Sequence, residues 1–185
     1  MKLATWNVNS IRARLTRLLR WLDGQKPDLL CLQELKVTED HFPFAEIEGA
    51  GYHAAVYGQK TYNGVAILSR TPLQQVEPGF GGADDDPAAR LISARVAGVR
   101  VISAYVPNGQ VLGSEKWAYK LEWLRKLRAY LDRTAHPQDK LVLCGDLNIA
   151  PEARDVAHPA AWEGSVLYCP EARAALEEVR AFGLV

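Results

Sequence analysis

The sequence of 185 residues has few cysteines and no long apolar run. Its three cysteines are an odd number, and Cys31 and Cys144 lie inside apolar stretches, where a thiol behaves as a small hydrophobic side chain. This usage fits a reducing compartment, and the N-terminus lacks a signal-peptide apolar region, so we expect a cytoplasmic protein. No apolar stretch approaches the length that crosses a bilayer, so no membrane partner is expected.

The chain also lacks a net charge: Lys and Arg together number 22, and Asp and Glu together also number 22. Attraction to a polyanion must therefore come from the placement of charges. Two basic segments are either solvated helix faces or polyanion-binding surfaces: Arg12, Arg14, Arg17 and Arg20 form one, and Lys116, Lys120, Arg125, Lys126 and Arg128 form the other. With 48% hydrophobic and 24% charged residues, disordered and collagen-like classes are excluded. We find no repeat or linker and expect a single domain over residues 1–185.

Apolar periodicity predicts alternating strands and helices at both ends of the chain and short strands between them. Strands are expected at about 3–8, 28–32, 52–57, 64–69, 91–96, 99–106 and 141–144, and helices at about 11–22, 117–131 and 170–182. The Ala97-Gly98 link predicts a hairpin. The Gly- and Asp-rich stretch from Gln74 to Ala89 is expected to be a surface loop, and residues 149–169 to be irregular.

The stretch LVLCGDLNIAP, residues 141–151, reads as a buried strand followed by polar side chains. Gly145 would let the backbone approach a neighbouring strand closely. Alternation along an extended backbone would place Asp146 and Asn148 on one face. The alternative is that these two residues only begin a turn.

Polar side chains also end two other predicted strands, at Asn7 and Glu34. With Asp146 and Asn148 they make four oxygen donors that can converge at strand ends. Such donors suit a hard cation, Mg²⁺ or Mn²⁺, and the absence of paired Cys or His argues against zinc. This pattern favours phosphate-ester chemistry, in which a metal neutralises developing charge and an acidic side chain activates water.

Five ordered motifs carry a family resemblance: TWNVN at 5–9, LQE at 32–34, NGVAILS at 63–69, YVPNG at 105–109 and GDLNIAP at 145–151. Together they resemble the endonuclease/exonuclease/phosphatase superfamily, most of all the exonuclease III branch of apurinic/apyrimidinic (AP) endonucleases. The fold we expect is an α/β class, four-layer α/β/β/α sandwich of two mixed sheets, incomplete at the C-terminus.

The resemblance implies roles for five residues. It implies Glu34 as a metal ligand, Asn7 close to the metal or the scissile phosphate, and Asp146 as the residue that activates water. It implies Asn148 as a hydrogen-bond donor to the transition state and Tyr105 as a phenol near the scissile phosphate.

Arg90 and Asn108 match positions that contact DNA phosphates in that family. The expected activity is Mg²⁺-dependent cleavage of DNA 5′ to an abasic site, with 3′–5′ exonuclease and 3′-phosphatase activities. The expected partner is double-stranded DNA with abasic sites or blocked 3′ ends. Two alternatives stay open: a phosphatase or phosphodiesterase acting on a small or lipid substrate, and a non-catalytic fragment that binds DNA or a partner.

The sequence departs from the family pattern in two ways. Asn9 stands where some relatives carry a second acidic residue, which puts a metal contact there in doubt. The family's later tryptophan-bearing strand, an Asp in an arginine-rich strand and a Ser-Asp-His segment are not found in this sequence. We therefore expect residues 1–185 alone to be marginally stable and weakly active, or completed by another chain or segment. The histidines are expected to be structural or exposed: His41, His53, His136 and His158.

Overall fold

The computed structural model describes residues 1–82 and 85–185, and the chain divides into two compact units. The first unit comprises Met1–Tyr105 and Lys140–Asp146, and the second comprises Val106–Asp139 and Leu147–Val185. The single domain expected from the sequence stays a prediction. Among the described residues, no helix is long and apolar enough to span a membrane.

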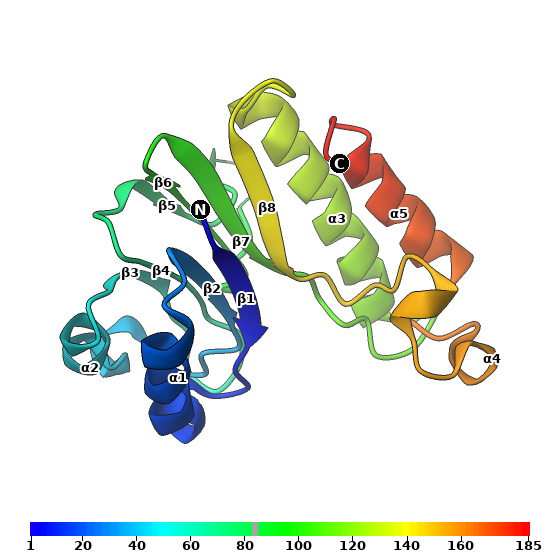
Figure 1. The fold of residues 1–185 in the computed structure, drawn as a ribbon. Coiled ribbons are helices and arrows are strands. Elements are labelled where there is room, and N and C mark those ends of the chain that lie inside the picture. Colours follow the sequence, from blue (N-terminus) through cyan, green and yellow to red (C-terminus); the bar gives the residue numbers. More distant parts are fainter. Residues whose placement is uncertain (83–84) are drawn as a thin grey trace. The chain divides into compact units, whose positions relative to one another are not determined.

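The first unit holds two mixed four-stranded sheets (Figure 1). In spatial order, the first sheet contains β1 (Leu3–Asn7), β2 (Leu29–Gln33), β4 (Val65–Ser69) and β3 (His53–Tyr57), and the second contains β5 (Gln74–Pro78), β6 (Leu91–Val96), β7 (Val99–Tyr105) and β8 (Leu141–Asp146). The pairs β1–β2 and β7–β8 are parallel, and the other pairs are antiparallel. The predicted hairpin joins β6 and β7 through Ala97 and Gly98, which both have positive φ.

Strand β2 is buried along its whole length, as its unbroken apolar run predicts. Because side chains alternate along a strand, Leu29 and Cys31 join the core between the two sheets, while Leu30 and Leu32 join the core on the other face. That second core is closed by two helices, α1 (Ile11–Gln25) and α2 (Phe44–Gly49), with the 3₁₀ turn η1 (Glu39–His41) before α2. The first unit is therefore layered as helices, sheet and sheet.

Helix α1 begins where the sequence predicts and extends to Gln25, past the predicted end near residue 22. The Ser10 hydroxyl accepts a hydrogen bond from the Ala13 amide at 3.4 Å, and Leu18 and Leu22 lie on its buried face. Lys26 follows in the left-handed conformation, and its amide donates to the Leu22 carbonyl, which ends the helix.

In the second unit, α3 (Glu115–Thr134) and α5 (Pro170–Arg180) lie side by side (Figure 1). The segment between β8 and α5 contains only the short η3 (Ala153–Asp155) and α4 (Pro159–Trp162), in line with the irregular stretch predicted there. Trp117 of α3 packs with Cys169 and Ala172 in a small core.

Three expectations from the sequence are wrong in detail. Strand β5 lies within the predicted loop at 74–89; all its residues are exposed, so no apolar alternation marked it. Strand β8 is half-buried rather than buried, because it is an edge strand in the described part of its sheet. Its extended backbone ends at Asp146, and Asn148 has a φ of +49°, so alternation does not place Asp146 and Asn148 on one face.

Candidate active site

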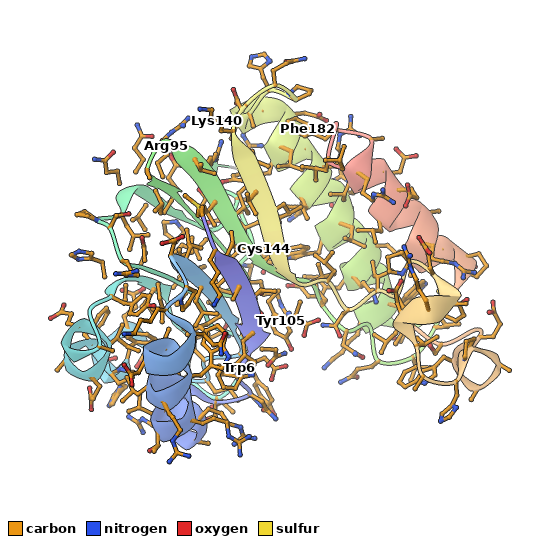
Figure 2. All side chains as sticks on the ribbon, in the orientation of Figure 1. Trp6, Arg95, Tyr105, Lys140, Cys144 and Phe182 are labelled. Carbon is orange, nitrogen blue, oxygen red and sulfur yellow. The ribbon has the colours of Figure 1, made fainter. Side chains whose placement is uncertain are left out.

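Two pairs of parallel strands bring polar residues to their carboxyl ends. Asn7 and Gln33 end β1 and β2 in register, and Tyr105 and Asp146 end β7 and β8 in register. In Figure 2, Lys140, just before β8, lies at the opposite end of the second sheet from Tyr105. Parallel strands run the same way, so residues that follow them share one edge.

A hydrogen-bonded network joins four of the predicted site residues. The Asn7 amide nitrogen donates to Glu34 Oε1 at 2.8 Å and to Asp146 Oδ2 at 2.8 Å. The Tyr105 hydroxyl donates to the same Glu34 oxygen at 2.9 Å. Residues from four strand ends, up to 139 positions apart in sequence, thus meet within the first unit.

Glu34 is held by a tight turn after β2. Its φ is +56°, and its carbonyl accepts from the Ser10 amide at 2.8 Å. The next amide, that of Leu35, donates to the Gly64 carbonyl at 3.1 Å. A Cβ on Gly64 would lie 2.9 Å from Leu35 Cβ, and its φ is +89°, so this position requires glycine. The NGVAILS motif therefore supports the Glu34 turn as well as forming β4.

Asp146 is placed by the glycine before it, as the sequence predicts. A Cβ on Gly145 would lie 1.9 Å from the Ala104 carbonyl oxygen. The missing side chain lets β8 pair closely with β7, with Asp146 opposite Tyr105.

The network keeps Glu34 ionised and Tyr105 protonated near neutral pH. Burial by itself would raise the pKa of Glu34, but hydrogen bonds from Asn7, Lys36 and Tyr105 outweigh it and lower that pKa overall. Burial, together with the hydrogen bond to Glu34 and its charge, raises the pKa of Tyr105 to about 12, although Arg90 opposes the rise. The site therefore pairs a carboxylate acceptor with a phenol donor.

Lys36 is a member of this cluster that the sequence reading missed. Its ammonium lies 3.1 Å from Glu34 Oε2 and also donates to the Asn9 side-chain oxygen. Asn9, which departs from the acidic residue of the family pattern, thus contacts a lysine. The signal was the spacing of Lys36 two residues after Glu34, on the same turn.

Gln33 is a second residue whose role the sequence reading missed. It is 1% exposed, and its side chain exchanges hydrogen bonds with Thr5 and donates to the Ser103 hydroxyl at 3.3 Å. Thr5 lies on β1 and Ser103 on β7, so Gln33 ties the two sheets together directly beside Glu34.

Arg90, predicted to contact DNA phosphates, lies against Tyr105. Its guanidinium is 4.6 Å from the centre of the Tyr105 ring, and Nη1 donates to the Tyr105 carbonyl at 3.1 Å. A phosphate contact by Arg90 stays a prediction.

The remaining predicted residues, Asn108 and Asn148, meet each other in the second unit. Asn108 Nδ2 donates to Asn148 Oδ1 at 3.3 Å, and Asn148 Nδ2 donates to the Val106 carbonyl at 2.9 Å. Their predicted roles toward DNA are not tested by this arrangement. The four histidines are exposed, as expected: His41, His53, His136 and His158.

The donor chemistry of the first unit fits a hard divalent cation. Glu34 and Asp146 direct carboxylate oxygens at one amide nitrogen, so the two anionic groups converge. Mg²⁺ sites commonly use one or two carboxylates and complete the shell with waters and substrate phosphates. Within residues 1–82 and 85–185, no group of three or more His, Cys, Asp or Glu is placed to hold a metal. Asn7 directs its amide nitrogen at the carboxylates, while its oxygen accepts from the Asn9 amide at 3.0 Å; its role as a ligand stays a prediction.

Comparison with protein families and curated proteins gives consistent matches. A model described as the Endonuclease/Exonuclease/phosphatase family matches residues 4–174. Exodeoxyribonuclease III of Haemophilus influenzae is 30% identical over 195 residues, spanning 100% of this chain and 73% of that protein. DNA repair nuclease APEX1 of Danio rerio is 35% identical over 179 residues, spanning 94% of this chain and 57% of that protein.

Solved structures of similar proteins match the chain over nearly its whole length. An AP endonuclease from Archaeoglobus fulgidus superimposes with a TM-score of 0.94 at 43% identity, covering 98% of this chain and 70% of that one. The 3′ phosphatase NExo from Neisseria, bound to a product DNA hairpin, gives a TM-score of 0.92 at 42% identity, covering 98% of this chain and 71% of that one. These likenesses confirm the predicted fold class, an α/β/β/α sandwich of two mixed sheets.

Proposed function

The chain belongs to the endonuclease/exonuclease/phosphatase family and is a hydrolytic nuclease of its exonuclease III branch. On that premise we propose that it cleaves DNA during repair, with Mg²⁺ or Mn²⁺ as the metal. Nucleases of this family are generally dependent on a divalent metal. The observation that carries the proposal is the network in which Asn7 bridges Glu34 and Asp146 while Tyr105 donates to Glu34.

In the proposed reaction, Asp146 acts as the general base. Its carboxylate takes a proton from water, the water oxygen attacks phosphorus, and the bond to the leaving oxygen breaks. The hydrogen bond from Asn7 to Asp146 Oδ2 orients the carboxylate for this transfer. Glu34 and Asp146, with Asn7, would hold the cation, which supplies positive charge to neutralise the developing phosphate charge.

Tyr105 has a donor role in this proposal. With a pKa of about 12 its hydroxyl keeps its proton at neutral pH, so it can donate to a phosphate oxygen. By family resemblance, Asn148 would donate to the transition state, and Arg90 and Asn108 would contact neighbouring phosphates.

The substrate we propose is double-stranded DNA with abasic sites or blocked 3′ ends. AP endonuclease, 3′–5′ exonuclease and 3′-phosphatase reactions all present a phosphodiester or monoester to the same carboxylates. Weakened activity of residues 1–185 alone, completion by another chain and a cytoplasmic location also stay predictions.

Cleavage of a labelled duplex with one abasic-site analogue tests the proposal. Asp146→Asn should lower turnover by roughly a hundredfold to ten-thousandfold and leave duplex affinity in the absence of divalent metal nearly unchanged. Asp23→Asn, the same change at an exposed carboxylate, is the matched control and should cleave like the wild type.

Three outcomes would contradict the proposal. Near-wild-type turnover of Asp146→Asn would remove the assigned base. Faster hydrolysis of a small phosphomonoester than of DNA would indicate a small-molecule enzyme. Salt-dependent duplex binding without any cleavage would indicate a binding protein.

A further inference from the structure

Lys120 of α3 is fully buried, at 0% exposure, although the sequence placed it in a basic segment considered for a solvated or polyanion-binding surface. Its ammonium donates to three backbone carbonyls, those of Asn108 at 3.1 Å, Asn148 at 2.7 Å and Val166 at 2.6 Å. The ring of Trp117 lies 5.7 Å from the same nitrogen. All these residues belong to the second unit.

A buried ammonium is costly unless its protons are hydrogen-bonded. Lys120 has three N–H groups, and three carbonyls receive them. The three carbonyls lie outside the helices and strands, so they take no part in a helix or sheet hydrogen-bond ladder. Lys120 supplies a donor to each of them, and they in turn solvate its buried charge. Three stretches distant in sequence are thereby fixed to one point on α3.

Two of the three carbonyls belong to Asn108 and Asn148, the predicted site residues of this unit. The side chain of Asn148 is bonded to the Val106 carbonyl and to Asn108, and its backbone is held by Lys120 in a left-handed conformation with φ +49°. Beside them, a Cβ on Gly109 would lie 3.1 Å from Lys120 Cδ, and the φ of Gly109 is +93°. The backbone of both asparagines is therefore set by the lysine.

We propose that Lys120 is a positioning residue, which holds Asn108 and Asn148 in the orientation used in phosphodiester cleavage; this rests on the proposed function. Its action is through the two backbone carbonyls. A displacement of about 1 Å at such residues can lower the rate of a reaction roughly a hundredfold.

Lys120→Met tests the proposal, because it keeps the length of the side chain and removes all three donors. Leu127→Ala, a buried change on the same helix, is the control for general loss of stability. In two-dimensional ¹⁵N NMR spectra, the side-chain amide signals of Asn108 and Asn148 should shift or broaden in Lys120→Met and not in Leu127→Ala. This readout does not depend on activity.

Kinetics on the abasic duplex give the second readout. Lys120→Met should lower kcat about tenfold to a hundredfold, because the Asn148 donor loses its orientation, and should raise KM by a smaller factor, because Asn108 is only one of the proposed phosphate contacts. In an Asn148→Ala background, Lys120→Met should lower kcat less than about threefold, since the side-chain amide that Lys120 positions is already absent. If Lys120→Met does not fold, Lys120→Arg replaces it: its planar group cannot serve three converging carbonyls and should give the same pattern.

Unchanged amide signals, or an equal loss of kcat in Leu127→Ala, would overturn the proposal. Additive losses in the double variant would do the same. A wild-type protein that cleaves no DNA would refute the proposed function, and the amide signals would still decide whether Lys120 positions the two asparagines.

Discussion

Replacing Gly145 with alanine should strongly destabilise the first unit. The new Cβ would lie 1.9 Å from the Ala104 oxygen and within 3 Å of the carbon and nitrogen of Ala104. All three are backbone atoms in the paired strand β7, so no side-chain rotation relieves the clash. The φ of Gly145, +147°, is also one that an L-residue rarely adopts.

The energetic costs of the steric clash and of the unfavourable backbone conformation can be estimated separately. Overpacking in a well-ordered core costs about 1–3 kcal/mol, and an unfavourable backbone conformation adds about 1–3 kcal/mol. We therefore expect Gly145→Ala to lower the free energy of unfolding by about 3 kcal/mol or more, a large part of the ~5–15 kcal/mol typical of a domain. Because Asp146 follows directly, DNA cleavage should also fall under conditions where the variant stays folded.

Urea unfolding followed by circular dichroism measures this loss. Gly24→Ala is the matched control: it lies inside α1, nothing lies within 4 Å of its added Cβ, and it should stabilise by about 0.4–1 kcal/mol. A free energy of unfolding for Gly145→Ala within about 0.5 kcal/mol of the wild type would refute the close approach of β7 and β8, since substitutions at unconstrained surface positions have effects of that size.

Three further predictions concern the site. Glu34→Gln removes one of few anionic ligands and should raise the Mg²⁺ concentration needed for half-maximal cleavage; an unchanged titration would exclude Glu34 as a ligand. Tyr105→Phe should lower turnover about tenfold or more, by analogy with loss of a donor to developing charge, without changing the shape of the pH–rate profile below pH ~10, because a phenol with a pKa of about 12 stays protonated there. Gln33→Leu should lower the free energy of unfolding by about 1–3 kcal/mol in urea titrations, because the buried Ser103 hydroxyl loses the Gln33 donor and Thr5 loses its bond to the same side chain; stability equal to the wild type would mean that this contact between the sheets contributes nothing.

Much of the fold could be predicted from the sequence, because its signals are local. The apolar run of β2, the apolar periodicity of α1 and the Ala97-Gly98 hairpin each depend on residues within a few positions of one another, and the structure has all three. Strand β5 could not be predicted, since its exposed residues carry no apolar alternation and its pairing partner lies in β6.

The candidate site divides in the same way. Polar residues at strand ends, Asn7, Glu34 and Asp146, could be identified from the sequence because an apolar run stops there. Their convergence was expected because α/β sheets assemble sites at strand ends, but the strand pairing and the atoms that join them depend on the register of two sheets. Asn148 could not be placed from the sequence. Alternation along a strand predicts that it shares a face with Asp146, but its backbone is left-handed, so the alternation ends before it.

Lysine at position 120 looks, in sequence, like its neighbours in a basic segment, and only the tertiary structure shows that it is buried. Gln33 and Lys36 are likewise ordinary polar residues until β7 and the Glu34 turn are placed around them. Periodicity and turn chemistry are properties of neighbouring residues, so the sequence by itself determined most of the helices and strands and their polar ends. Burial and hydrogen-bond partners depend on segments far apart in the chain, so which polar groups face one another was decided only by packing.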